Sequence, residues 1–283
     1  MIPFLVFFVI SIIAPLVYSG YLSFFKKRLV GGNSFVGFTN YLQAIQDQEF
    51  WAGLSRVALF FLMQVPLMLL LALAFALIID SGRIRFSKFV RVLIFVPYAV
   101  PAVVATLMWG YLYGPNYGLF AQLSEYLNTP KILFFSEIMT LPSIANIVTW
   151  EFVGYNMVIL YAAIKSFSTE LYEAAEVDGA GSWRIAWSIK VPQLRPAIFL
   201  CLIFSVIGSF QLYVEPVQML NLAPTTINNT YTPNMYAYNQ AFVSQDINYA
   251  AAVSFMLGLV VFLMSILVSF MGRHAQQYEK RVK

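Results

Sequence analysis

The hydrophobic positions of this chain form long continuous runs that are separated by shorter polar segments. The run VPLMLLLALAFALII (65–79) does not alternate between apolar and polar side chains, whereas transmembrane β-strands alternate over segments of about 10 residues. A helix needs about 20 predominantly apolar residues to cross the hydrocarbon core of a membrane. The pattern therefore predicts an all-α polytopic membrane protein with six transmembrane helices, at about 2–24, 57–79, 90–113, 143–164, 197–219 and 250–271.

Composition supports the membrane assignment and narrows the chemistry. Of the 283 residues, 60% are hydrophobic and 11% are charged, whereas an average soluble domain carries about 25% charged residues. Cys201 is the only cysteine and His274 is the only histidine, which excludes a disulfide within the chain and a histidine-rich metal site. Because no pair of a nucleophile and a base is recognisable, the chain is not expected to be an enzyme.

Basic residues are unevenly distributed over the polar segments. Four lie between the second and third spans, four lie in the segment 165–196, and four lie in the C-terminal tail, which puts twelve of the seventeen on one side of the membrane. Lysine and arginine accumulate in cytoplasmic loops. Both termini and the segment 165–196 are therefore expected in the cytoplasm, with Lys26, Lys27 and Arg28 as a weaker contrary signal.

The densest polar segment, EAAEVDGAGSWRIAWSIKVPQLRP (173–196), lies between the fourth and fifth spans. Its capping residues, glycine and prolines predict two short helices joined by a turn. On composition alone, an interfacial amphipathic loop anchored by Trp183 and Trp187 is the commoner explanation. The expected boundaries are Ser168 or Thr169 as the first cap, Gly179 as a left-handed turn, Ser182 as the second cap, Pro192 as the end, and Pro196 as the start of the fifth span.

The order of residues in this segment resembles a family signature. Permeases of ABC importers carry the pattern EAA-x3-G-x9-I-x-LP, which the chain matches from Glu173 through Gly179 and Ile189 to Pro192, with Val191 in place of leucine. The resemblance implies a cytoplasmic coupling helix, within the segment 168–192, that docks into a groove on an ATPase subunit. The residues that the resemblance assigns to this contact are Glu173, Ala174, Ala175, Asp178, Gly179 and Ala180.

Other stretches resemble the carbohydrate-uptake branch of that family, which includes maltose- and glycerol-phosphate-type permeases. These stretches are 35–61, 91–119 and 238–257, whereas LNLAPTT (220–226) departs from the Gly-Gly-Pro turn of that branch. No lysine follows a glycine, so the chain has no Walker A loop of its own. The resemblance implies a single permease domain, 1–283, in the cytoplasmic (inner) membrane of a bacterium or archaeon.

The resemblance also implies a set of partners. They are a cytoplasmic ABC ATPase dimer, a second homologous permease subunit, and an extracytoplasmic solute-binding protein that delivers a sugar. ATP and magnesium are expected in the partner ATPase, and no cofactor is expected in this chain.

Two carboxylates lie inside or at the edge of the expected spans. Burying a charge at the centre of a membrane helix costs about 3 kcal/mol, so Glu151 and Glu215 are expected to face a cavity. Glu151 shares a helix face with Tyr155, and Glu215 shares one with Gln211. The resemblance to maltodextrin-type permeases implies sugar contacts at Glu151, Tyr155, Gly208 and Gln211. Two alternatives remain. Glu151 pairs structurally with a partner permease, or Glu215 is simply solvated at the membrane surface.

These observations together predict the translocation subunit of an ATP-driven importer that moves a mono- or oligosaccharide by alternating access. A polyamine or glycerol phosphate is the alternative solute. The two membrane carboxylates also suit a cation, which favours the polyamine over the anionic phosphate. An ion-coupled secondary transporter that uses Glu151 is the alternative class, but it gives no reason for the signature at 173–192. A purely structural membrane scaffold explains neither the signature nor the membrane carboxylates.

Overall fold

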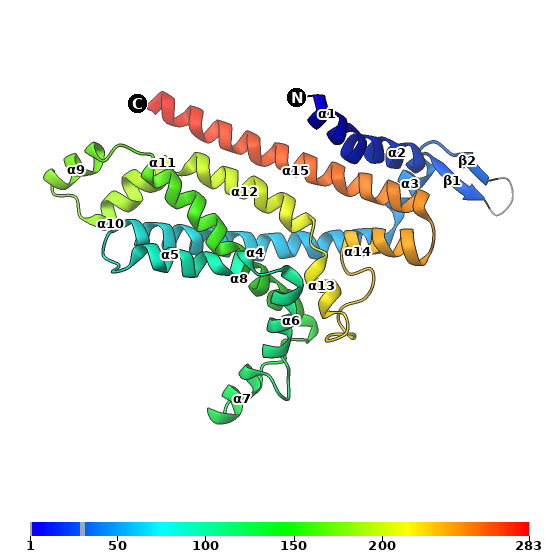
Figure 1. The fold of residues 1–283 in the computed structure, drawn as a ribbon, viewed down its shortest axis with the longest axis horizontal. Coiled ribbons are helices and arrows are strands. Elements are labelled where there is room, and N and C mark those ends of the chain that lie inside the picture. Colours follow the sequence, from blue (N-terminus) through cyan, green and yellow to red (C-terminus); the bar gives the residue numbers. More distant parts are fainter. Residues whose placement is uncertain (1, 29–31, 283) are drawn as a thin grey trace.

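The computed structural model describes the backbone of residues 2–28 and 32–282, and the side chains of these residues as far as Gly272. The described chain is almost wholly helical (Figure 1), which confirms the predicted all-α polytopic fold apart from one short β-ribbon. The first elements are α1 (Ile2–Phe8), η1 (Val9–Ile13), α2 (Ala14–Ser23), β1 (Phe25–Arg28), β2 (Gly32–Phe35), α3 (Thr39–Gln46), α4 (Gln48–Asp80), α5 (Ser87–Phe95), η2 (Val96–Ala99), α6 (Ala102–Leu112) and α7 (Leu119–Tyr126). They are followed by α8 (Glu137–Lys165), α9 (Glu170–Val177), α10 (Ser182–Ile185), η3 (Ala186–Lys190), α11 (Val191–Gln193), α12 (Arg195–Phe210), α13 (Val214–Met219), α14 (Pro233–Tyr238), η4 (Asn239–Val243) and α15 (Ile247–Val282).

Five helical stretches of the described chain are long and apolar enough to cross a membrane, or six when one bent pair counts as a single span. The second span begins at Gln48 rather than near 57, because Asp47 caps the helix by accepting a hydrogen bond from the Glu49 N–H at 2.9 Å. The long stretches are Ile2–Ser23, Gln48–Asp80, Glu137–Lys165, Arg195–Met219 and Ile247–Gly272.

The predicted third span, 90–113, is wrong as a single helix. The helical stretches Ser87–Ala99 and Ala102–Leu112 meet at an angle of 97°. Val100 has extended backbone angles (φ −77°, ψ 129°) and is followed by Pro101 at the start of α6. A proline ring clashes with a helical residue before it, so the helix must break here. The bend brings η2 against α8.

The fifth span has the predicted extent but is interrupted. α12 ends at Phe210 and α13 begins at Val214, and the residues between them are not helical. Two carbonyl groups near the break accept side-chain hydrogen bonds from the start of α14: its N-cap Thr232 donates to Leu212 at 3.0 Å, and Asn234 donates to Phe210 at 2.9 Å. Irregular backbone is tolerated at membrane depth only where its polar groups find such partners or face a cavity.

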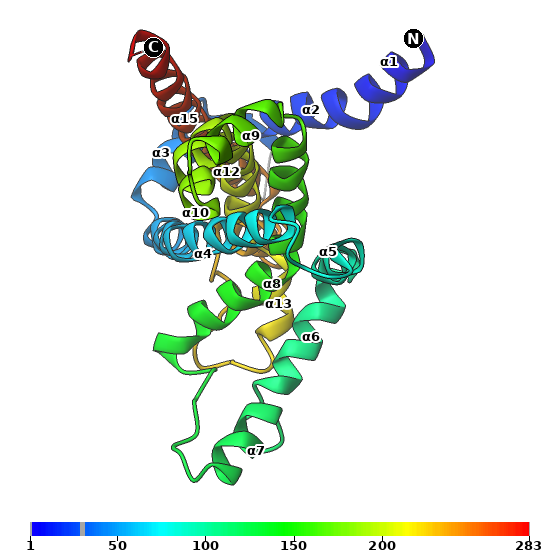
Figure 2. The same cartoon turned by 90° about the vertical axis from the view of Figure 1, so that its left-hand side faces the viewer.

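The interior of the molecule is formed by four long helices. α4 lies along α8, and α12 packs against both α4 and α15 (Figures 1 and 2). Ala72 and Ala76 of α4 are fully buried in the cluster that includes Met157 and Leu160 of α8. Small residues allow membrane helices to approach closely, which explains the long contact between α4 and α8.

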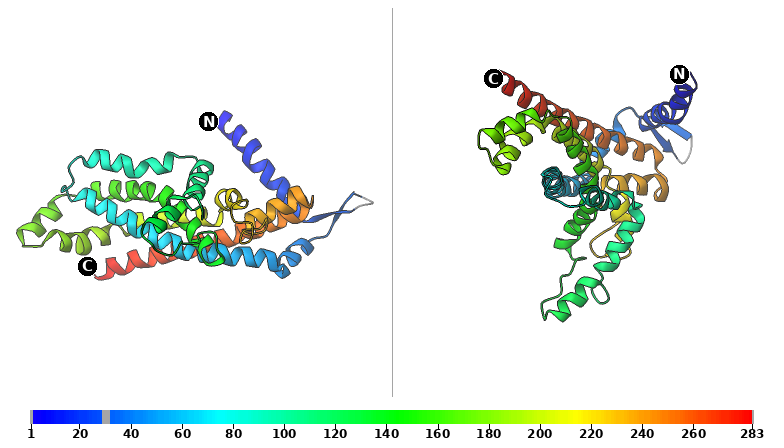
Figure 3. Two further views of the ribbon diagram at one scale, coloured as in Figure 1. Left: turned by 90° about the horizontal axis from the view of Figure 1, so that it is seen from below. Right: turned by 60° about the vertical axis from the view of Figure 1, so that its left-hand side comes forward.

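The two ends of the molecule differ in structure. α9 and α10 lie at one end, and the β1–β2 ribbon lies at the opposite end (Figures 1 and 3). At the ribbon end, Tyr236 and Tyr249 donate hydrogen bonds to the carboxylate of Asp47, which joins the starts of α4 and α15 to α14. α1 points away from the other helices (Figure 2), whereas α2 contacts α15, and none of the residues in their apolar stretch is buried.

Candidate functional site

A cavity of about 380 Å³ lies between α4, η2, α8 and the interrupted fifth span. This volume falls in the range of small-molecule sites, about 300–1,000 Å³. Four of the predicted substrate residues line it: Tyr155 from α8, Gly208 and Gln211 from the end of α12, and Glu215 from α13. The structure thus brings the residues from two separate spans to one cavity.

Glu151 is not among the residues that line the cavity. Its side chain is buried, and its Oε2 atom has no hydrogen-bond partner among the described residues. Glu151 is therefore a buried polar group behind the cavity wall, one helical turn before Tyr155.

Tyr98 forms an aromatic wall of the cavity that the sequence analysis did not identify. Its ring stacks on that of Tyr155, with centroids 4.8 Å apart and planes at 22°, and it meets the edge of Phe152 at 5.7 Å. Tyr98 reaches α8 because the chain bends after η2. The available signal was the pair of prolines that flank this tyrosine, in VPYAVP (96–101).

Two amide side chains complete the polar part of the cavity wall. Gln64 of α4 is 2% exposed and Asn156 of α8 is 3% exposed. Asn156 donates to the carbonyl of Phe152 at 3.0 Å, and both amides point a nitrogen toward the sulfur of Met68. A lone glutamine in the apolar run FFLMQVPLMLL (60–70) was the signal for this site.

The segment 168–192 forms a helical hairpin with an unburied first helix. α9 buries none of its residues, and Ser168 rather than Thr169 accepts the N–H of Glu170, at 3.3 Å. Gly179 has φ +82°, as predicted for a left-handed turn. Trp183 of the second helix is 76% exposed.

Two details of this segment differ from the prediction. Ser182 does not cap the second helix, because its hydroxyl accepts a hydrogen bond from Arg83 at 3.1 Å and Gly181 holds the capping position. Pro192 does not end the helix, because the π-helical turn η3 precedes it and helical backbone continues to Leu194. A π-turn widens the helix locally, and a proline in its first turn leaves no required N–H unpaired.

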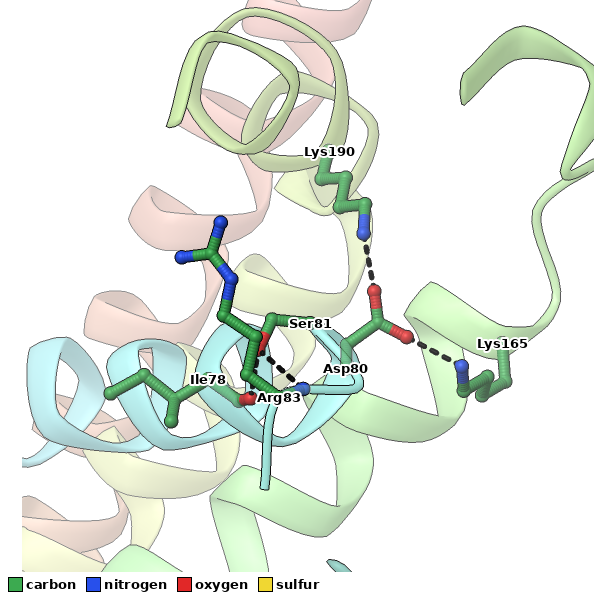
Figure 4. Close-up of polar contacts among 6 residues, drawn as sticks. All are labelled: Ile78, Asp80, Ser81, Arg83, Lys165 and Lys190. Atoms are coloured by element: carbon green, nitrogen blue, oxygen red, sulfur yellow. Dashed lines mark hydrogen bonds and ion pairs between the residues drawn. The ribbon is translucent and has the colours of Figure 1, made fainter. Parts of the chain in front are cut away.

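Asp80 joins this segment to the membrane helices, and the sequence analysis did not identify it. Asp80 is the last residue of α4. One of its carboxylate oxygens forms an ion pair with the Nζ atom of Lys165 on α8 at 2.6 Å, and the other forms an ion pair with Lys190 of η3 (Figure 4). Its side chain is 5% exposed. The sequence signal was a single acid between an apolar run and a basic loop.

The architecture defines the class of protein. A polytopic helical bundle with a cavity that exposes a few polar groups at an interrupted membrane helix is the arrangement of a membrane transport protein. The chain belongs to the family of binding-protein-dependent transport system inner membrane components, whose pattern matches residues 69–278. It is a multi-pass inner-membrane permease subunit of an ABC importer, and the ATPase is a separate subunit. This membership decides against the ion-coupled alternative.

Individual relatives agree with the family. The permease protein NgcF of the diacetylchitobiose uptake system of Streptomyces coelicolor is 33% identical over 253 residues, which cover 85% of this chain and 71% of NgcF. The permease protein LacF of the lactose transport system of Rhizobium radiobacter is 29% identical over 249 residues, which cover 84% of this chain and 81% of LacF. The crystal structure of a bacterial ABC transporter involved in the import of alginate contains a chain of similar fold. The two chains superpose with a TM-score of 0.83 and 19% sequence identity, over 96% of this chain and 93% of that one.

Proposed function

We propose that this chain, as a single permease domain (1–283), forms with a second permease the pathway for a mono- or oligosaccharide delivered by an extracytoplasmic binding protein. The chemistry of the cavity supports this most directly. The stacked rings of Tyr98 and Tyr155 offer apolar faces for a sugar ring, and Gln211 and Glu215 offer amide and carboxylate groups for its hydroxyls. The relatives NgcF and LacF belong to diacetylchitobiose and lactose systems, which points to the same solute class.

A neutral solute fits the charges of the cavity. None of the residues described as lining it is lysine or arginine, so a phosphate or an acidic sugar finds no counter-charge there. Glu215, with Glu151 behind it, accepts hydrogen bonds from hydroxyl groups. The same two carboxylates favour a cation, which makes a polyamine the second candidate.

Competition for uptake distinguishes these solutes. A panel of neutral mono- and disaccharides, an acidic oligosaccharide, and spermidine is offered to the assembled importer with its binding protein. We expect competition by a neutral sugar alone. Competition by spermidine in place of sugars would move the assignment to the polyamine class.

The orientation in the membrane follows from charge. Arg83, Arg85, Lys88 and Arg91 lie between α4 and α6, and α9 and α10 lie near the same end of the molecule. We infer that this end, and with it both termini, is cytoplasmic. The tail residues that also entered the prediction, Arg273, Lys280, Arg281 and Lys283, lie outside the described side chains.

We infer that the segment 168–192 binds the ATPase dimer. Three observations support this: no residue of α9 is fully buried, the apolar side chains of Val177 and Trp183 are 88% and 76% exposed, and Gly179 turns the chain at the tip. An exposed apolar surface flanked by acids suits a protein partner. In this interface Glu173 forms an ion pair with a basic residue of the ATPase. The other residues in contact with the ATPase are Ala174, Ala175, Asp178 and Ala180.

The second permease is supported by the unburied α1–α2 stretch. No residue of its apolar window is buried, although α2 touches α15, so the exposed face of this stretch is open to another membrane subunit as well as to lipid.

Purification of the tagged chain from its native membranes tests the assembly. We expect an ATPase and a second permease to copurify with the wild type. Glu173→Lys should lose the ATPase and solute uptake but keep the second permease, because the reversed charge repels the basic partner. Glu125→Lys, an exposed acid on α7, is the matched control and should keep all subunits. A wild-type chain that purifies alone and moves solute in liposomes without ATP would contradict the proposal.

A further inference from the structure

The carboxylate of Asp80 is the point at which α4, α8 and the segment 168–192 meet (Figure 4). Because the carboxylate is nearly buried, removal of a cation leaves its charge poorly compensated, and removal of the carboxylate leaves two ammonium groups facing each other. An exposed ion pair such as Glu125–Lys131, at 3.9 Å, contributes little by comparison. The cluster therefore constrains the three elements more strongly than surface charges do.

Lys190 extends this connection to both halves of the segment. It belongs to η3 in the second half, and its Nζ atom also lies 4.8 Å from the centre of the Tyr172 ring on α9. The Tyr172 hydroxyl is buried and has no hydrogen-bond partner among the described residues. The ring of Tyr172 is thus held through its face by the cation of Lys190.

Few apolar contacts support the same connection. A cavity of about 320 Å³ lies between α9, η3 and the ends of α4 and α8, and Asp80 and Lys190 are part of its wall. α9 has no buried residue, and Ile185 is the buried residue of α10. The additional hydrogen bond from Arg83 to Ser182 is exposed. The ion pairs of Asp80 are therefore the main polar connection between the segment and the membrane helices.

The two helices joined at Asp80 also form the solute cavity. α4 contributes Gln64 and Met68 to its wall, and α8 contributes Tyr155 and Asn156. Both helices are continuous from these residues to the cluster. Rigid secondary-structure elements carry coupling between distant sites, so a displacement at the cluster reaches both walls of the cavity.

We propose that Asp80 is a positioning residue of the transport cycle, which together with Lys165 and Lys190 transmits movement of the segment 168–192 to the solute cavity. The proposal rests on the proposed function of that segment as the ATPase contact. Without the carboxylate, the segment still binds the ATPase, but its movement no longer displaces α4 and α8. ATP hydrolysis then continues without the corresponding movement of solute.

The test compares solute uptake with ATP hydrolysis in the complete importer, reconstituted in liposomes with its binding protein. Asp80→Asn keeps the shape of the side chain and removes its charge, and Lys190→Met removes one cation from a partly exposed position. We expect both variants to assemble, to hydrolyse ATP at a nearly unchanged rate, and to transport about tenfold less solute per ATP, a loss within the range typical of coupling between sites. Lys190→Arg should restore the ratio, because it keeps the charge.

Glu125→Gln and Lys131→Met, which break the exposed pair, are the matched controls and should keep the wild-type ratio of uptake to hydrolysis. The proposal is overturned if Asp80→Asn and Lys190→Met keep that ratio, or if uptake and hydrolysis fall together in both, since that would indicate a role in folding alone. If the wild-type chain itself recovers no ATPase, the proposed function of the segment is at fault and the role of Asp80 is rejected with it.

Discussion

Gly154 lies where α8 passes closest to the backbone of α5. A Cβ atom built on Gly154 would stand 2.0 Å from the carbonyl oxygen of Ile94 and 2.8 Å from the Cα atom of Phe95. Both neighbours are backbone atoms, which cannot rotate away as the end of a side chain can. Gly154→Ala must therefore push α5 and η2 away from α8.

The displacement has two measurable effects. Inserting atoms into a packed interior costs about 1–3 kcal/mol, so Gly154→Ala should unfold at a lower temperature in detergent. It should also weaken solute binding, because the next residue, Tyr155, stacks on Tyr98 of η2 at 4.8 Å. Thermal unfolding followed by tryptophan fluorescence measures the first effect, and the apparent affinity of solute uptake measures the second.

Gly258→Ala on α15 is the matched control. A Cβ atom at Gly258 meets no heavy atom within 4 Å, and alanine in a helix interior is about 0.5–1 kcal/mol more favourable than glycine. We expect this variant to be slightly stabilised and to transport normally. If the two alanine variants unfolded at the same temperature, the close approach of α5 and α8 at Gly154 would be refuted.

Two further predictions concern the cavity and the ribbon end. Tyr98→Ala should weaken the apparent affinity for the solute by about 3- to 10-fold, the value of one aromatic contact. Tyr98→Phe keeps the ring and should bind with nearly the wild-type affinity. An unchanged affinity for the alanine variant would show that Tyr98 is not part of the binding site. Burial raises the pKa of Asp47, but the hydrogen bonds from Tyr236 and Tyr249, together with those from the backbone N–H groups of Glu49 and Phe50, outweigh it and hold this pKa below its usual range. The stabilisation by Asp47 is therefore present above the unfolded pKa of about 4 and is lost as the pH falls through the lower folded pKa. Asp47→Asn should cost about 1 kcal/mol at neutral pH, and its difference in melting temperature from the wild type should shrink in acid; a constant difference would count against this account.

Local physical chemistry determines much of this protein, and the sequence alone was enough to find it. An apolar run in a membrane becomes a helix because every backbone N–H and C=O group must find a partner within the segment. The spans could therefore be located, and the family signature at 173–192 could be read directly. The turn at Gly179 follows in the same way, since its φ of +82° disfavours any residue with a side chain.

The bend of the third span shows where local information ends. Pro101 indicates that a helix breaks, but the 97° angle depends on where η2 packs, and that depends on the space that Gly154 leaves on α8. The break in the fifth span is similar, because it persists only where Thr232 and Asn234 reach the freed carbonyls. No pattern within 197–219 reports these partners.

The solute cavity and the Asp80 cluster were decided by the tertiary structure. Asp80 and Lys190 are 110 positions apart, and Tyr98 meets Tyr155 only after the chain has bent. Such contacts form between residues that no local repeat relates, and their energy depends on burial that exists only in the folded molecule. The sequence therefore supplied the helices and the chemistry, and packing between distant helices decided which side chains meet.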